Sequence, residues 1–208
     1  MRRKKSIMEY RRPAAEATIE QVVLGSRFVA RASRAEDVPS VRDQLKTIQE
    51  ALPGAHHHAY AFRVGYGASV VEGKSDAGEP KGTAGQPILS FIRGSDLGDL
   101  LVVVSRYFGG RKLGTGGLVR AYGGAAREVI ESLQWEWRVE KTQLSLSVPY
   151  PFLSRVRHLM QAYDIQEVAS QYQADALLVV AIATKERHHF QNAITELSAG
   201  LIAIQATD

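Results

Sequence analysis

The stretch Leu100–Glu131, LLVVVSRYFGGRKLGTGGLVRAYGGAAREVIE, is the most informative part of the chain. It begins with a continuous apolar run, Leu100–Val104, which is typical of a buried strand. Apolar residues then recur at helical spacing, at Leu118, Tyr122, Ala126, Val129 and Leu133. The pattern therefore predicts a strand, a glycine-rich loop and a helix in immediate succession.

Seven of the eighteen glycines lie in this stretch, at Gly109, Gly110, Gly114, Gly116, Gly117, Gly123 and Gly124. A glycine inside a helix costs about 1 kcal/mol relative to alanine, so each one needs a reason. Gly123 and Gly124, in mid-helix, indicate close packing against a neighbouring element. Gly114, Gly116 and Gly117 fall where the helix begins, and free backbone N–H groups there favour an anion. A tight turn flanked by solvated basic residues is the competing interpretation.

The charges around these glycines have one sign. Every formal charge from Leu100 to Arg127 is positive: Arg106, Arg111, Lys112, Arg120 and Arg127. Such a patch favours phosphate, although neither GxxxxGK[ST] nor the complete dinucleotide fingerprint is present. The expected anion- or nucleic-acid-binding residues are Arg106, Tyr107, Gly109, Gly110, Lys112, Gly114, Thr115, Gly116, Gly117 and Arg120. Tyr107 or Phe108 could stack on a base.

Length and composition suit an ordinary protein of one large or two small domains, with 208 residues, 45% apolar and 23% charged. Cysteine is absent, which excludes disulfides and thiolate metal sites and is compatible with a cytoplasmic protein. No apolar run is long enough for a membrane helix. The basic start, MRRKKSIMEYRR, is a poor secretory signal, so residues 1–15 are interpreted as a flexible basic tail.

The chain changes character near Trp137. Residues 1–137 contain seventeen of the eighteen glycines and 20 basic against 15 acidic residues, a net charge of +5. Residues 138–208 contain 6 basic and 7 acidic residues, a net charge of −1. We therefore expect two domains, 16–137 and 138–208. A polyanion such as RNA should bind to the first domain, because that domain is basic.

The first domain contains several recognisable elements. IEQVVLGSRFVARA, from Ile19 to Ala32, predicts a hairpin joined at Gly25 and Ser26. Asp37 is a predicted N-cap for a helix that Pro53 ends. A strand is expected after His56–His58, and a helix opens at Pro87.

Three consecutive histidines in a strand alternate between faces, so a three-histidine metal site is poor geometry. We therefore predict neither a metal nor a cofactor. His57 could instead line the cleft of the glycine loop.

A long loop without periodicity is expected from Gly65 to Gln86. Its close carboxylate pair, Asp76 and Glu79, could bind a cation or transfer protons, but turn capping is the stronger interpretation. The candidate second cleft loop consists of His57, Asp76, Glu79, Lys81 and Thr83.

The second domain has the order strand, helix, strand, strand, helix, strand. Its segments begin at Thr142, Phe152, Ile165, Ala176, Phe190 and Leu201. The order βαββαβ is that of ferredoxin-like folds, with an antiparallel sheet and both helices on one face. The fold class is therefore α+β.

Several motifs coincide with a known family: SRF at Ser26, HHAYAF at His57, SDAGEPKGTAGQP at Ser75 and VVSRYFGGRKLGTGGLVRAYGG at Val103. Together they resemble the IMPACT family, close to its bacterial YigZ-type members, over nearly the whole chain. The resemblance implies two α/β two-layer sandwiches, a first domain like ribosomal protein S5 domain 2 and a ferredoxin-like second. Ala77 replaces a carboxylate expected in bacterial members, which weakens a metal or acid–base role for the loop.

Three functional hypotheses remain open. The first is a cytoplasmic, translation-related regulatory protein that binds RNA or the ribosome through a phosphate-like anion site at the glycine loop. The second is an enzyme acting on a small phosphorylated or carboxylated metabolite. The third is a protein-interaction adaptor like the eukaryotic relatives, which regulate translation through a protein partner.

Overall fold

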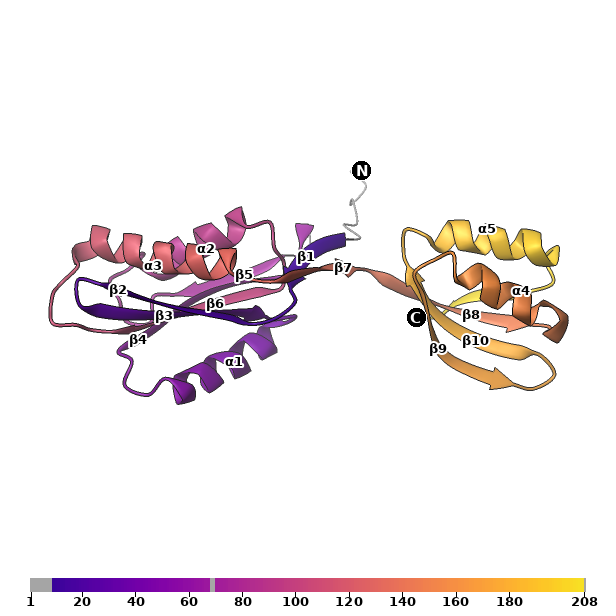
Figure 1. Ribbon diagram of the computed structural model, residues 1–208, viewed down its shortest axis with the longest axis horizontal. Helices are drawn as coiled ribbons and strands as arrows, with labels where there is room; N and C mark the ends of the chain where they lie inside the picture. Colours follow the sequence, from indigo (N-terminus) through magenta and orange to yellow (C-terminus); the bar gives the residue numbers. More distant parts are fainter. Residues whose placement is uncertain (1–8, 68–69, 208) are drawn as a thin grey trace. The chain divides into compact units, whose positions relative to one another are not determined.

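The structure is a computed structural model that describes residues 9–67 and 70–207. The chain divides into two compact units, one ending at Arg138 and the other beginning at Val139. Figure 1 traces the elements of each unit along the chain. Among the described residues, no helix is long and apolar enough to cross a membrane.

The first unit contains a five-stranded sheet, with every neighbouring pair antiparallel. Its strands are β2 (Ala17–Val23), β3 (Ser26–Arg34), β4 (His57–Val64), β5 (Val71–Ser75) and β6 (Leu100–Tyr107), in the order β2-β3-β6-β4-β5. The predicted apolar strand is confirmed as β6, which is central and buried from Leu100 to Arg106. A central position explains its continuous apolar run, because both of its faces are covered.

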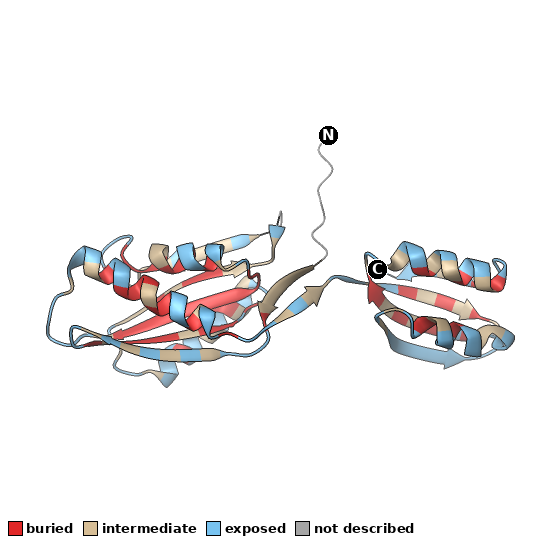
Figure 2. Ribbon diagram, turned by 45° about the horizontal axis from the view of Figure 1, so that its top comes forward, coloured by how far each residue is buried: buried red, intermediate tan, exposed pale blue. Residues whose placement is uncertain are grey.

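Helices cover both faces of this sheet. α2 (Gly85–Gly94) and α3 (Gly114–Glu131) lie on one face, and α1 (Val38–Ala51) lies on the other (Figure 1). The α+β class is confirmed, and α1 adds a third layer to the two that were expected. Figure 2 shows the buried positions concentrated on the sheet and on the inner faces of the helices.

Two local sequence signals are confirmed. A hairpin joins β2 to β3, although its turn is Leu24–Gly25, one residue earlier than expected, with φ of 47° and 82°. Positive φ at both central residues is the type I′ geometry that suits tight hairpins. Asp37 caps α1, accepting a hydrogen bond from the Ser40 backbone N–H at 2.7 Å.

The glycines of α3 have a packing role at one position. A Cβ atom at Gly123 would lie 3.0 Å from the Phe91 ring of α2, so the close-packing interpretation is confirmed there. At Gly124 the nearest atom would be 3.9 Å away, which is ordinary contact.

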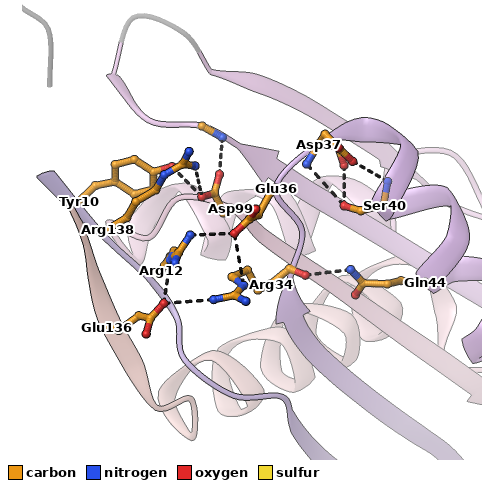
Figure 3. A network of polar contacts seen from close by, with 11 residues as sticks. Tyr10, Arg12, Arg34, Glu36, Asp37, Ser40, Gln44, Asp99, Glu136 and Arg138 are labelled. Atoms are coloured by element: carbon orange, nitrogen blue, oxygen red, sulfur yellow. Dashed lines mark hydrogen bonds and ion pairs between the residues drawn. The ribbon is translucent and has the colours of Figure 1, made fainter. Parts of the chain in front are cut away.

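The expectation of a flexible tail up to residue 15 is wrong for Glu9–Pro13, while residues 1–8 lie outside the described part of the chain. Glu9–Pro13 form β1, which pairs with β7 (Trp135–Val139) in a separate two-stranded sheet. Polar contacts fix this ribbon to the first unit (Figure 3). Buried Asp99 accepts hydrogen bonds from the Tyr10 hydroxyl at 2.6 Å and from Arg138 at 2.9 Å.

The long loop expected from Gly65 to Gln86 is also corrected, because β5 and the start of α2 interrupt it. β5 is an edge strand that pairs with β4, and its short sequence VEGKS gives little periodicity. Gly73 is required within it, since a Cβ atom there would collide with the Phe62 ring.

The second unit has the predicted order and topology. Its elements are β8 (Lys141–Val148), α4 (Tyr150–Met160), β9 (Ile165–Tyr172), β10 (Ala176–Ala183), α5 (Arg187–Ser198) and β11 (Ala203–Thr207). The sheet order β11-β8-β10-β9 is antiparallel throughout, as expected for a ferredoxin-like fold. Both helices bury apolar side chains against one face, including Val156 and Phe190.

Candidate anion-binding site

A pocket of about 250 Å³ opens in the first unit between the two loops that the sequence singled out. The 75–87 loop contributes Glu79 and Pro80, and the loop after β6 leads into the start of α3. The lining residues are Glu79, Pro80, Arg106, Phe108, Lys112, Leu113, Gly114, Thr115 and Leu118. The structure thus brings the glycine loop and part of the second cleft loop to one site.

The rim of the pocket is the uncapped beginning of α3. Leu113 is the N-cap residue and provides no side-chain hydrogen bond, and the first turn contains no acidic residue. The backbone N–H groups of that turn therefore lack a side-chain acceptor, which is the arrangement that attracts anions. Lys112 and Thr115 are exposed beside them.

Two of the three glycines at this helix start have a clear local role. Gly114 has a φ of 69°, which favours glycine, and a Cβ atom at Gly117 would lie 3.0 Å from that of Leu113. Gly116 has neither constraint, since its nearest neighbour would be the Arg120 guanidinium at 3.9 Å. Neither a positive φ nor close packing therefore explains Gly116.

The floor of the pocket is a buried ion pair. Arg106 donates to Glu79 Oε1 at 2.7 Å, and the Tyr122 hydroxyl donates to the same oxygen at 2.8 Å. Arg106 is 6% exposed and Glu79 is 9% exposed. Burial, followed by the hydrogen bond to Glu79, raises the pKa of Tyr122 above its ordinary value, so the hydroxyl keeps its proton. The positive charge of Arg106, expected to contact phosphate, is thus balanced by Glu79.

Arg106 is held between two aromatic rings, with its guanidinium 5.6 Å from the Phe28 ring centre and 5.5 Å from that of Phe108. It also donates to Ser26 Oγ at 3.3 Å. Its Nε atom is buried and has no hydrogen-bond partner in the part of the chain that the structure describes. Phe108, by contrast, is 45% exposed at the mouth of the pocket.

Asp76 has a structural role. Its Oδ1 accepts from the backbone N–H groups of Ala84 and Gly85, and its Oδ2 accepts from that of Gly82 at 2.8 Å. Burial alone would raise the pKa of this carboxyl group, but the three N–H donors outweigh it and lower the pKa. Asp76 therefore caps the start of α2, in agreement with the turn-capping interpretation.

The three consecutive histidines have three different environments. His57 Nδ1 lies 2.9 Å from the Ala77 carbonyl oxygen, so that nitrogen carries the proton, and Nε2 lies 3.9 Å from Glu79 Oε1. His58 contacts Ser105 Oγ, and His56 accepts from the Phe108 N–H. Burial, and secondarily His57, lowers the pKa of His58. Within the described residues, no cluster of potential metal ligands is found.

The remaining predicted residues lie around the pocket without lining it. The Tyr107 ring lies under the Arg27 guanidinium at 4.0 Å, so that face is already occupied. Gly109 contacts Gly25 so closely that no side chain fits, and Gly110 has a φ of 85°. Arg120 and Lys81 are exposed, and Thr83 is buried and donates to the Pro80 carbonyl.

Sequence reasoning missed several residues of this site. Tyr122 was assigned only to the apolar face of α3, and its hydroxyl was the single hint of a polar role. Ser26 stood within a quoted motif without a function, yet its Oγ accepts from both Arg106 and the Gly109 N–H.

Comparisons with known proteins show which family the chain resembles. The Impact N-terminal domain matches residues 24–130, and a domain of unknown function (DUF1949) matches residues 146–201. The chain belongs to the IMPACT family. It is 36% identical to an IMPACT family member from Haemophilus influenzae, over 95% of this chain and 96% of the relative. It is also 33% identical to the IMPACT family member YigZ of Escherichia coli, over 94% and 97%.

The IMPACT fold is also found in a solved structure described as a hypothetical protein. That structure superposes with a TM-score of 0.70 at 32% identity, over 97% of this chain and 98% of the other. The resemblance inferred from the sequence motifs is thereby confirmed across both domains.

Proposed function

We propose that this protein binds RNA through its first domain and acts in translation or its regulation. The observation that carries the proposal is the uncapped, glycine-rich start of α3, which opens onto a pocket lined by Lys112. Phosphate oxygens accept hydrogen bonds from free backbone N–H groups and from lysine and arginine, whatever the base sequence.

Charge supports the same conclusion. Residues 1–137 have a net charge of +5, and Arg111, Lys112 and Arg120, which precede or follow the start of α3 in the sequence, are exposed. Within the described residues, none of these three is in an ion pair, unlike Arg106 on the floor. Binding of this kind is strongly salt-dependent, because each neutralised phosphate releases counterions.

The substitution Gly116→Asp tests the proposal cleanly. A side chain fits there, and an acid in the first turn of a helix stabilises it by about 0.3–1 kcal/mol. The same carboxylate would repel a phosphate at the helix start. We therefore expect unchanged or slightly higher stability, while affinity for ribosomal RNA in filter binding falls about tenfold or more.

Two variants serve as controls. Gly116→Ala adds a side chain without a charge and should leave RNA binding unchanged. Gly124→Asp makes the same charge change about 12 Å further along α3, where contacts are ordinary, and should have little effect.

Ribosome co-sedimentation over a series of salt concentrations tests the link to translation. Loss of binding with rising salt is the expected result. Absence of binding at low salt, or salt-independent binding that Gly116→Asp leaves intact, would contradict the proposal and favour the adaptor hypothesis.

A further inference from the structure

We infer that the pocket holds a terminal ribonucleotide with a phosphate monoester, the phosphate at the start of α3 and the sugar over the Arg106–Glu79 floor. This inference rests on the proposed function and specifies which part of an RNA enters the site. Three features of the pocket carry it: its size, the unpaired carboxylate oxygen on its floor and the aromatic ring at its mouth.

The pocket is small and closed at the bottom. About 250 Å³ is below the roughly 300 Å³ at which ligand pockets usually begin, so it accepts little more than one nucleotide unit. Arg106 and Glu79 are both more than nine-tenths buried and close its floor. A strand cannot pass through such a site, and a duplex cannot enter it. A single nucleotide at the end of a strand is a unit that fits.

Within the described part of the chain, the floor presents one unpaired polar atom, the second carboxylate oxygen of Glu79. Glu79 Oε1 accepts hydrogen bonds from both Arg106 and Tyr122, but no donor among the described residues contacts Oε2. A phosphate alone would accept hydrogen bonds from the N–H groups at the start of α3, but the negative charge of Glu79 would repel it. A ribose supplies hydroxyl groups that can donate to the Glu79 carboxylate, and the 2′-hydroxyl distinguishes RNA from DNA.

The mouth of the pocket offers a stacking surface. The Phe108 ring is 45% exposed, and the Arg106 guanidinium lies 5.5 Å from its centre. An exposed aromatic ring next to a positively charged groove is how single-stranded nucleic acids are bound without sequence preference. A base attached to the sugar at the floor could stack on this ring.

The rim favours a monoester over an internal phosphodiester. A monoester has a charge near −2 at neutral pH because its second pKa is about 6, whereas a diester has a charge of −1. The attracting groups are the positive end of α3 and Lys112. The monoester, with its larger negative charge, is therefore attracted more strongly by the helix start and by Lys112.

The test is equilibrium binding of the full-length protein to labelled six-nucleotide RNAs with a 5′-phosphate, a 3′-phosphate or hydroxyls at both ends. The matching DNA oligonucleotides form a second series. We expect one phosphorylated RNA end to bind at least tenfold more tightly than the hydroxyl form and more tightly than its DNA counterpart.

Two substitutions locate the effect. Phe108→Ala should weaken binding of the phosphorylated RNA about tenfold, whereas Phe91→Ala, an exposed ring on α2 that does not line the pocket, should not. Glu79→Gln should reduce the preference for RNA over DNA. Circular dichroism checks folding, and Phe108→Ala remains decisive if Glu79→Gln does not fold, because Phe108 is a surface residue.

The outcomes separate the two proposals. Salt-dependent RNA binding that ignores the terminal phosphate would overturn this inference and leave the proposed function intact. Equal binding of RNA and DNA ends, with displacement by inorganic phosphate, would reduce the pocket to a simple phosphate site and also overturn it. Failure of every oligonucleotide and of ribosomal RNA to bind would overturn the proposed function itself.

Discussion

A single carboxylate, Asp76, organises the loop that forms one wall of the pocket. It accepts hydrogen bonds from the backbone N–H groups of Gly82, Ala84 and Gly85, and so holds the segment that leads into α2. The spacing of six to nine residues is beyond any local capping pattern, and the sequence therefore indicated only a turn.

Replacement of Asp76 tests this role. Asp76→Asn removes the charge and turns one acceptor into a donor that faces an N–H group. Hydrogen bonds to charged groups contribute about 1.5–3 kcal/mol each, so we expect a loss of at least 2 kcal/mol in urea unfolding. The exposed Asp43→Asn is the matched control and should change stability little. An equally small effect at Asp76 would contradict the capping role.

The same carboxyl group makes a pH prediction. Its pKa is lowered in the folded state, so the stability it contributes is present above the unfolded value of 3.8 and is lost as the pH falls through the folded pKa. Between neutral pH and pH 3, the stability difference between the protein and Asp76→Asn should therefore narrow only at the acidic end. A constant difference down to pH 2 would show that the charge is irrelevant.

Ala77 adopts a conformation that alanine disfavours. Its φ is 49°, in the left-handed region, where a residue with a Cβ atom loses about 1–2 kcal/mol and asparagine is better tolerated. Ala77→Asn should therefore raise the unfolding free energy by about 0.5–1 kcal/mol. The same change at exposed Ala51, within α1, should lower it, because asparagine is a poorer helix former. Thermal unfolding of both variants is sufficient, and a loss at position 77 would be inconsistent with this explanation.

At the scale of elements, local signals were enough where an element is long and its signals are contiguous. Asp37 and Pro53 predicted where α1 begins and ends, and the run from Leu100 predicted β6. The five-residue strands β1 and β5 were missed, because EYRRP and VEGKS are too short and polar for a period to show. Their pairing partners, β7 and β4, stabilise them through contacts distant in the sequence.

The candidate site was predictable only in part for the same reason. The glycine loop is continuous in the sequence, and its position at the start of α3 followed from the pattern. The ion pair between Arg106 and Glu79 joins residues 27 positions apart, and Tyr122 joins from 43 positions away. From the sequence alone, Arg106 was expected to be a cation available to a phosphate. Only the fold shows that Glu79 is its partner.

The ribbon formed by β1 and β7 should make the stability of the protein depend on pH in the alkaline range. Burial, then the hydrogen bond to Asp99, raises the pKa of Tyr10 from 10.0 to about 12. The proton is bound more tightly in the folded state, so this contribution to stability is present below pH 10 and lost as the pH rises through 12. Tyr10→Phe should unfold more readily by about 1–2 kcal/mol at pH 8.

The comparison to make is the slope of stability against pH. From pH 10 to 12, the stability of Tyr10→Phe should fall less steeply than that of the unaltered protein, as followed by thermal unfolding. Other tyrosines contribute equally to both, so the difference isolates Tyr10. Parallel curves would mean that the hydroxyl does not hold the ribbon.

At the scale of the whole molecule, the two units have separate hydrophobic cores. The second contains Leu144, Val180, Phe190 and their neighbours, and the first contains two clusters on either side of its sheet. Two-state unfolding is consequently not expected of the chain as a whole.

Native-state hydrogen exchange can test this independence. Phe190 is fully buried, and Phe190→Ala should cost its unit about 3–5 kcal/mol through the cavity it leaves. Exchange should accelerate in β8 and β10 and stay unchanged in β6. Val129→Ala, in the buried face of α3, is the reciprocal variant and should spare β10. Acceleration in both units from either change would show that they unfold together.

The backbone contact between Gly25 and Gly109 has a consequence for how such proteins diverge. The two positions lie in different turns, yet neither has room for a side chain facing the other. A longer hairpin between β2 and β3 would push directly on the segment that leads from Phe108 to Lys112. We therefore expect that related proteins with residues inserted in that hairpin also have a glycine loop of altered length. The lengths of the two turns should thus change together during evolution.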